Sequence, residues 1–299
     1  MNHASLFRLV LLSAIWGASF LLLRIGAPVL GPAWLIFLRV LLAALFLLAV
    51  GFHMGKALEA RRHWRHYLVL GCFNSALPFL LFAYAATGIS ASLMSILNAT
   101  APIWAALIGA LWTRTALAAT TLFGMLLGIM GVGVLTGIEA LTLPPGGTLA
   151  MGAAVAAACC YGIATTYAKS ASPVEPFANA HGSMWGATIL LLPVLLFAPL
   201  PAAAPGAGIV AAVVMLGVVC SGLAYLLYFR LIADLGATPA LTVTFLIPVF
   251  GVLWGHLFLD EAVGWHTLAG AALVLLGTAL TTGFSPAAVF ALRREKIAR

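Results

Sequence analysis

The sequence has very little charge. Asp, Glu, Lys and Arg together make up 7% of its 299 residues, whereas 64% of the residues are hydrophobic. Soluble domains carry roughly 25% charged residues. A mean hydropathy of +1.16 therefore excludes an ordinary soluble protein and predicts a chain that crosses a membrane many times.

Cysteine is also scarce, and its placement excludes further classes of protein. The four cysteines fall inside apolar runs and are predicted to be small core residues: Cys72, Cys159, Cys160 and Cys220. Their spacing matches neither a disulfide framework nor a metal site. Because no Ser/His, Asp/Asp or His-x-x-x-His set falls at membrane depth, we predict no enzyme activity, no metal and no cofactor.

Apolar runs of membrane-spanning length recur along the chain. A transmembrane helix needs ~20 mainly apolar residues, whereas the strands of a membrane β-barrel are shorter and alternate in polarity. We therefore predict an all-α membrane protein with ten transmembrane helices, near residues 7–27, 33–52, 67–87, 91–112, 118–137, 148–169, 178–198, 209–230, 238–258 and 265–285.

Basic residues mark one side of this bundle. The net charge of +7 comes mainly from the chain ends and alternate loops, at Arg8, Lys56, Arg61, Arg62, Arg65, Arg114, Lys169, Arg230, Arg293, Arg294, Lys296 and Arg299. The loops between these contain no Lys or Arg, so the positive-inside rule places both termini in the cytoplasm. The basic residues thus indicate contact with membrane lipid rather than with nucleic acid.

A shift of 146 positions aligns the sequence with itself. The segment NATAPIWAALIGALW (98–112) lies over TFLIPVFGVLWGHLF (244–258), which pairs Pro102 with Pro248. Glycines pair in the same register: Gly109 with Gly255, Gly124 with Gly270, and Gly131 with Gly277. Two unrelated apolar helices can also look alike, but matched prolines and glycines favour a true internal repeat.

The repeat predicts two domains of five helices each, residues 1–143 and 148–299, separated by a TLPPGG linker. An odd number of spans inverts the second half relative to the first. The aligned charges agree, because Arg114 falls on the predicted cytoplasmic side and its counterpart Asp260 on the other. Inverted repeats around a central cavity, with interrupted helices near the midplane, are typical of secondary transporters.

The sequence resembles the EamA-type proteins of the drug/metabolite transporter superfamily over nearly its whole length. The resemblance is carried by AIWGASF (14–20), Arg39, the patterns around both repeat prolines, the LDE turn (259–261) and the glycine runs of spans 5 and 10. Within the superfamily the sequence is most similar to the YddG-type amino-acid exporters. The resemblance implies a bacterial inner-membrane exporter of amino acids or similar metabolites, with a cavity lined by spans 3, 4, 8 and 9. The sequence departs from many relatives at Arg114-Thr115, where they carry an acidic residue.

Three prolines are predicted to kink their helices. Each frees the backbone carbonyl four residues earlier, which belongs to a residue with a polar side chain: Pro78 and Asn74, Pro102 and Asn98, Pro248 and Thr244. Unsatisfied backbone groups are costly in lipid and should face protein or water. We predict that these polar groups bind the ammonium and carboxylate of a zwitterion, the alternative being hydrogen bonds to neighbouring helices.

Aromatic residues are predicted at the same depth. Ser221, Tyr225 and Tyr228 share one face of span 8 by helical spacing. With Phe79, Phe82, Trp104 and Tyr161 they are candidate substrate-binding residues, because small-molecule sites combine apolar walls with a few polar groups. The alternative for each ring is ordinary packing.

Arg39 is the one clearly intramembrane charge, about two turns inside span 2. It is predicted to bind a substrate carboxylate, or else to reach the headgroups or to pair with Asp260 or Glu261. All seven acids fall at span ends or in loops, which predicts facilitated diffusion rather than coupling through a buried carboxylate. The alternative substrates are lipophilic drugs and phosphorylated metabolites or nucleotide sugars. The glycine faces of spans 5 and 10 suggest a monomer or weak dimer.

Overall fold

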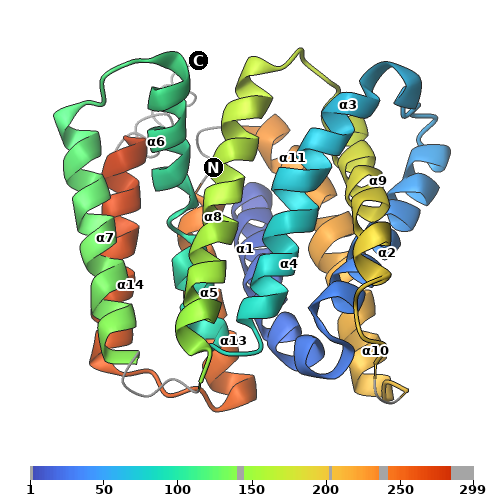
Figure 1. Cartoon of the computed structure of the whole chain (residues 1–299). Coiled ribbons are helices and arrows are strands. Elements are labelled where there is room, and N and C mark those ends of the chain that lie inside the picture. Colours follow the sequence, from blue (N-terminus) through green and yellow to red (C-terminus); the bar gives the residue numbers. More distant parts are fainter. Residues whose placement is uncertain (1–2, 140–144, 202–203, 236–241, 284–299) are drawn as a thin grey trace.

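The computed structural model describes residues 3–139, 145–201, 204–235 and 242–283, and these residues form helices and no strand (Figure 1). The helices are α1 (His3–Leu30), α2 (Pro32–His53), α3 (Ala60–Leu70), η1 (Gly71–Ala76), α4 (Leu77–Ala85), α5 (Ala91–Asn98), α6 (Ala101–Thr113), α7 (Ala119–Glu139), α8 (Gly147–Ser170), α9 (Pro176–Leu195), α10 (Ala207–Val214), η2 (Met215–Leu223), α11 (Ala224–Leu235), α13 (Val243–Leu259) and α14 (Trp265–Thr282).

Continuous and broken helices together form the ten predicted spans. In the part of the chain that the structure describes, seven spans are long and apolar enough to cross a membrane, and Ala119–Leu135 and Val243–Leu259 are shorter apolar helices. Helix α9 is the tenth. The third span begins at Ala60 rather than near residue 67, because the basic segment before it is already helical. The predicted ten-helix fold is confirmed.

The two halves of the chain run in opposite directions through the bundle. Helix α1 begins at the end that also carries the linkers 54–59 and 171–175, which we call the basic face (Figure 1). Helix α8, the first of the second half, begins at the other end, the opposite face. Because five spans separate the two starting points, the second repeat is inverted, as predicted.

Three spans depart from regular α-helix near the middle. Proline kinks were predicted in the third, fourth and ninth spans, and no irregularity was predicted in the eighth. The third and eighth spans contain π-helical segments, η1 and η2, whose wider turns leave the regular hydrogen-bond pattern. Pro78 is the second residue of α4, just after η1 ends, where a proline is tolerated. The fourth span separates into α5 and α6 at residues 99–100, just before Pro102. Of the three predicted kink prolines, Pro248 lies within an uninterrupted helix, α13.

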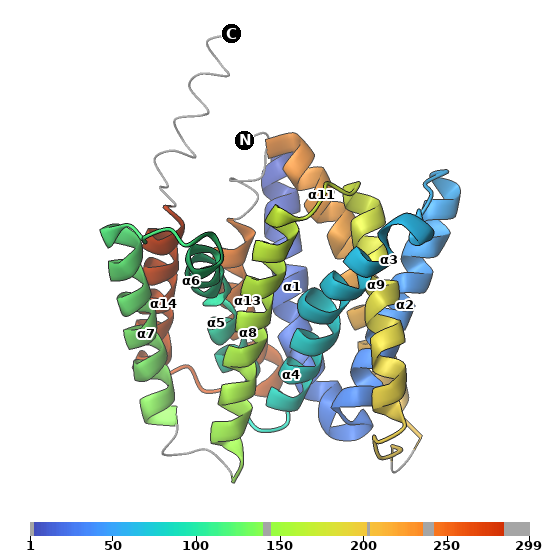
Figure 2. The same ribbon diagram turned by 45° about the horizontal axis from the view of Figure 1, so that its top comes forward.

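Helices α7 and α14 pack against each other along one side of the bundle (Figure 2). Their glycines allow the backbones to touch: a Cβ at Gly124 would lie 2.7 Å from the Gly277 carbonyl, and one at Gly131 would lie 2.7 Å from the Val274 amide. Small residues are what membrane helices use for such close approach. The predicted structural role of these glycines is confirmed.

Candidate functional site

Arg39 lies in the interior of the bundle with an exposed fraction of only 4%. Its Nε donates a hydrogen bond to the Ser221 Oγ at 2.9 Å, and its guanidinium carbon lies 3.7 Å from the centre of the Phe79 ring. Among the described residues no carboxylate forms an ion pair with it, so pairing with Asp260 or Glu261 is not observed. An arginine stays protonated in proteins. The site therefore contains a buried positive charge without a protein counter-ion.

A close approach between α2 and η2 brings Arg39 to Ser221. A Cβ at Gly217 would lie 2.9 Å from the Arg39 carbonyl and 2.6 Å from the Leu42 Cβ, so only glycine lets the two backbones come this close. Ser221 lies one turn after Gly217 and donates its own hydroxyl proton to the Leu216 carbonyl, 2.9 Å away. That second bond orients the Ser221 oxygen as an acceptor for the guanidinium.

Asn74 and Tyr225, from the two π-containing spans, also meet. The Asn74 Nδ2 donates to the Tyr225 hydroxyl at 3.0 Å. Both side chains are half-buried, so they remain in contact with accessible space. The Tyr225 hydroxyl oxygen is the acceptor of this bond, so it links the third span to the eighth.

The aromatic residues of the site come in pairs related by the internal repeat. The 146-residue shift relates Phe79 to Tyr225 and Phe82 to Tyr228, and a shift of 145 relates Trp16 to Tyr161. Equivalent contacts follow: Trp16 lies 5.4 Å from Tyr228, and Tyr161 lies 6.4 Å from Phe82, between ring centres. The two halves thus supply matching aromatic walls, and of these six rings the three from the second half carry hydroxyl groups: Tyr161 of α8 and Tyr225 and Tyr228 of α11.

Three other predicted site residues lie on the fourth and ninth spans. Asn98 is the last residue of α5, and Trp104 lies on α6, where its backbone packs against Gly162 of α8. Within the described ranges neither forms a hydrogen bond or a ring contact with the residues around Arg39. Thr244 lies in the first turn of α13, one turn before Pro248.

The break before Pro102 leaves a backbone carbonyl that is paired from another helix. The Ala99 carbonyl receives a hydrogen bond from Thr278 Oγ1 of α14 at 2.8 Å. That the Asn98 carbonyl is also freed by Pro102 stays a prediction. Helix α14 thus supplies the hydrogen-bond donor for a backbone carbonyl at the break in the fourth span.

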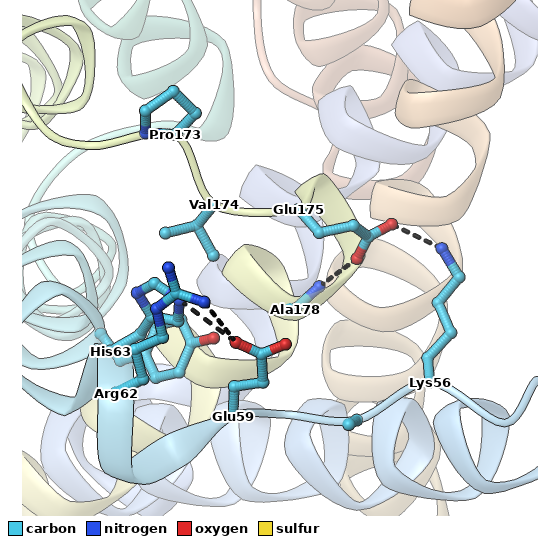
Figure 3. Close-up of a pocket in the computed structure, with 10 residues that line it drawn as sticks. Lys56, Glu59, Arg62, His63, Pro173, Val174, Glu175 and Ala178 are labelled. Carbon is cyan, nitrogen blue, oxygen red and sulfur yellow. Dashed lines mark hydrogen bonds and ion pairs between the residues drawn. The ribbon is translucent and has the colours of Figure 1, made fainter.

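A cavity of about 370 Å³ opens at the basic face between the linkers 54–59 and 171–175 (Figure 3). Its charges pair with one another: the Lys56 Nζ lies 2.5 Å from the Glu175 Oε1, and Arg62 lies 3.5 Å from Glu59. Burial alone would raise the pKa of Glu175, but the hydrogen bonds from Lys56 and from the Ala178 amide outweigh it, so the pKa lies below its ordinary value. The acids and bases that line the cavity therefore compensate one another, whereas the Arg39 guanidinium forms no ion pair among the described residues.

Two features of the site carried little or no signal in the sequence. The π-helical segment η2 contains no proline, so nothing in its residue pattern distinguishes it from an ordinary helix. Trp16 belongs to the site through its ring contacts and through its Nε1, which donates to the Cys220 carbonyl at 3.2 Å. Its alignment with Tyr161 in the repeat was the available signal.

The comparisons with known proteins agree with this architecture. The model of the EamA-like transporter family matches residues 4–137 and again residues 148–283. The chain is 22% identical over 277 residues to uncharacterized transporter YoaV of Bacillus subtilis, covering 92% of this chain and 95% of the relative. It is 27% identical over 275 residues to an uncharacterized transporter of Archaeoglobus fulgidus, covering 90% of this chain and 95% of the relative.

A solved crystal structure shares the fold. It superposes with a TM-score of 0.65 at 18% sequence identity, covering 94% of this chain and 97% of that chain. Because the family model matches both halves, nearly the whole chain is accounted for. The chain belongs to the EamA-like transporter family, whose members transport small molecules across membranes.

Proposed function

We propose that the protein exports neutral or aromatic amino acids, or similar small carboxylates, across the bacterial inner membrane by alternating access. The observation that carries this proposal is the buried Arg39 guanidinium without a protein counter-ion. Unpaired buried charge is costly, and ionisable residues inside a membrane usually mark a substrate path. A carboxylate fits the planar guanidinium fork with two parallel hydrogen bonds.

The surroundings of Arg39 support a substrate with an apolar side chain. Phe79 lies against the guanidinium. Two ring pairs from the same spans accompany it, Phe82 with Tyr161 and Trp16 with Tyr228. Aromatic walls bury apolar groups and favour stacked or edge-on rings. The hydroxyl and amide groups nearby would accept the hydrogen bonds of a substrate ammonium.

The same features disfavour the rival substrates. A phosphorylated metabolite carries about two negative charges and favours several cations, whereas the cluster has a single arginine. A lipophilic drug needs no buried guanidinium. In the described spans no acid lies beside the cluster, which supports movement down a gradient without a proton relay. By the positive-inside rule, the basic face lies in the cytoplasm together with both termini.

The test is uptake of radiolabelled amino acids into proteoliposomes with no ion gradient, using neutral, aromatic and charged species. We expect saturable uptake of neutral or aromatic species, and a loss of uptake in Arg39→Gln. Arg65→Gln, which removes an exposed charge from α3, is the matched control and should transport normally. Saturable uptake of a sugar phosphate or of a lipophilic cation, with no amino-acid uptake, would overturn the proposal.

A further inference from the structure

The linker between α4 and α5, on the opposite face, is held at both ends by charged side chains. At one end, the Arg24 Nη1 donates to the Ala86 carbonyl at 2.7 Å. At the other, the Glu261 carboxylate accepts hydrogen bonds from the amides of Ala91 and Ser92, at 2.6 and 2.9 Å, and from the Ser92 hydroxyl at 2.5 Å. Both charged residues come from outside the linker.

These charges match the helix ends that they contact. The last carbonyls of a helix and its first amides have no partners within the helix and carry opposite partial charges. Arg24 places a cation at the C-terminal end of α4, whose cap is Ala86. Glu261 places an anion at the N-terminal end of α5. The contacts thus satisfy backbone groups that would otherwise need water.

The contacts of Arg24 and Glu261 with the linker join elements that also form the candidate site. Arg24 lies on α1, two turns beyond Trp16, and the linker follows α4, which carries Phe79 and Phe82. Glu261 follows α13 and reaches back over Gly255, where a Cβ would clash with its carboxylate. If the site opens to the opposite face by separation of these helices, the hydrogen bonds of Arg24 and Glu261 with the linker must break.

The basic face lacks an equivalent carboxylate. The internal repeat pairs Asp260 and Glu261 with Arg114 and Thr115, so the turn after α6 has a cation and a hydroxyl where the turn after α13 has two acids. The hydroxyl of Thr115 lies 2.7 Å from that of Thr113, within its own turn. The two faces are therefore held by different chemistry.

We propose that Glu261 and Arg24 form a latch that keeps the opposite face closed, and that its release is the step that exposes the site on that face. The latch favours the conformation that faces the basic side. The proposal rests on the proposed function only in requiring two alternating conformations, and it does not depend on the identity of the substrate.

The test measures access to the site from the opposite face alone. A variant that keeps Cys220 and replaces the other three cysteines with alanine provides a reporter, because this thiol is 2% exposed and adjoins Ser221. A membrane-impermeant maleimide is added to right-side-out vesicles, and the labelling rate of Cys220 is measured. Asp260→Asn, which removes a neighbouring acid with no hydrogen bond among the described residues, is the matched control for Glu261→Gln.

We expect Glu261→Gln to raise the labelling rate about tenfold or more, which is the shift that follows from losing hydrogen bonds to a charged group. Asp260→Asn should label like the parent. Ser92→Ala removes one of the three hydrogen bonds to Glu261 and should give a smaller increase in the labelling rate. If Glu261→Gln does not fold, the labelling rate of Ser92→Ala tests the latch in its place. Parental rates in Glu261→Gln and Ser92→Ala would overturn the latch, as would an equal increase in Asp260→Asn.

Labelling and transport give separate answers. If Glu261→Gln labels faster but no variant transports amino acids, the latch stands and the proposed substrate class fails. If amino acids are transported but labelling does not change, the substrate class stands and the latch fails.

Discussion

Replacing Arg39 with methionine separates a substrate-binding role from a structural role, because the first predicts lost transport with little change in stability and the second predicts a large loss of stability. Methionine keeps an unbranched, flexible side chain and removes the charge. The Ser221 hydroxyl still has its bond to the Leu216 carbonyl, so the change leaves no buried hydroxyl without a partner. The Phe79 ring loses the guanidinium that lies 3.7 Å from its centre.

The expected magnitudes follow from these contacts. Losing the hydrogen bond and the cation–π contact costs about 2–5 kcal/mol together. Removing an unpaired charge that is 4% exposed relieves a desolvation penalty of several kcal/mol. The two effects nearly cancel, so we expect a free energy of unfolding within about 2 kcal/mol of the wild-type value. Transport should suffer far more, because a desolvated charge pair with substrate is worth about 2–5 kcal/mol, or roughly 30- to 5,000-fold in apparent affinity.

The assay pairs thermal unfolding in detergent with substrate uptake in proteoliposomes. About 1 kcal/mol corresponds to roughly 2–4 °C in the midpoint for a chain of this size class, so the midpoint of Arg39→Met should stay within about 8 °C of wild type while uptake at low substrate concentration is lost. A midpoint more than about 10 °C lower would show that Arg39 stabilises the fold. Unchanged uptake would refute the carboxylate-binding role directly.

Three other variants test the fold and the basic face. Thr278→Val leaves the Ala99 carbonyl without its donor and should lower the free energy of unfolding by about 1–3 kcal/mol in a thermal melt; an unchanged melt would mean that water replaces the hydroxyl. Gly124→Leu drives a side chain into backbone only 2.7 Å from the added Cβ, so the melting midpoint should fall sharply while substrate KM in the folded fraction is unchanged; a normal midpoint would contradict the close packing. Because the pKa of Glu175 is lowered on folding, its stabilisation is present above the unfolded value of about 4.3 and is lost as pH falls through the folded value. Glu175→Gln should therefore be less stable than wild type at pH 7, by less than about 1 kcal/mol because Lys56 and Glu175 are partly exposed, and the difference should shrink as the pH falls below the unfolded value; a constant difference would exclude the ion pair as its source.

Much of the fold could be predicted from the sequence because lipid imposes simple rules. Hydrocarbon requires every spanning segment to satisfy its own backbone, so long apolar runs must be helices. The 146-residue repeat and the alternation of basic loops then determine the inversion of the second half. The solitary intramembrane charge at Arg39 and the matched aromatic positions also follow from composition and spacing alone.

The tertiary structure decided which of these residues meet. Arg39 and Ser221 are 182 residues apart, and their contact depends on how closely α2 approaches η2 at Gly217, which no local pattern encodes. The π-helical turns and the break before Pro102 rotate the following residues about the helix axis. The break also places the Ala99 carbonyl where Thr278 of α14, 179 residues away, donates to it. Sequence periodicity determines which face of a helix is apolar. Which residues of two distant helices meet depends on how each helix is rotated about its axis, and packing between distant segments sets that rotation.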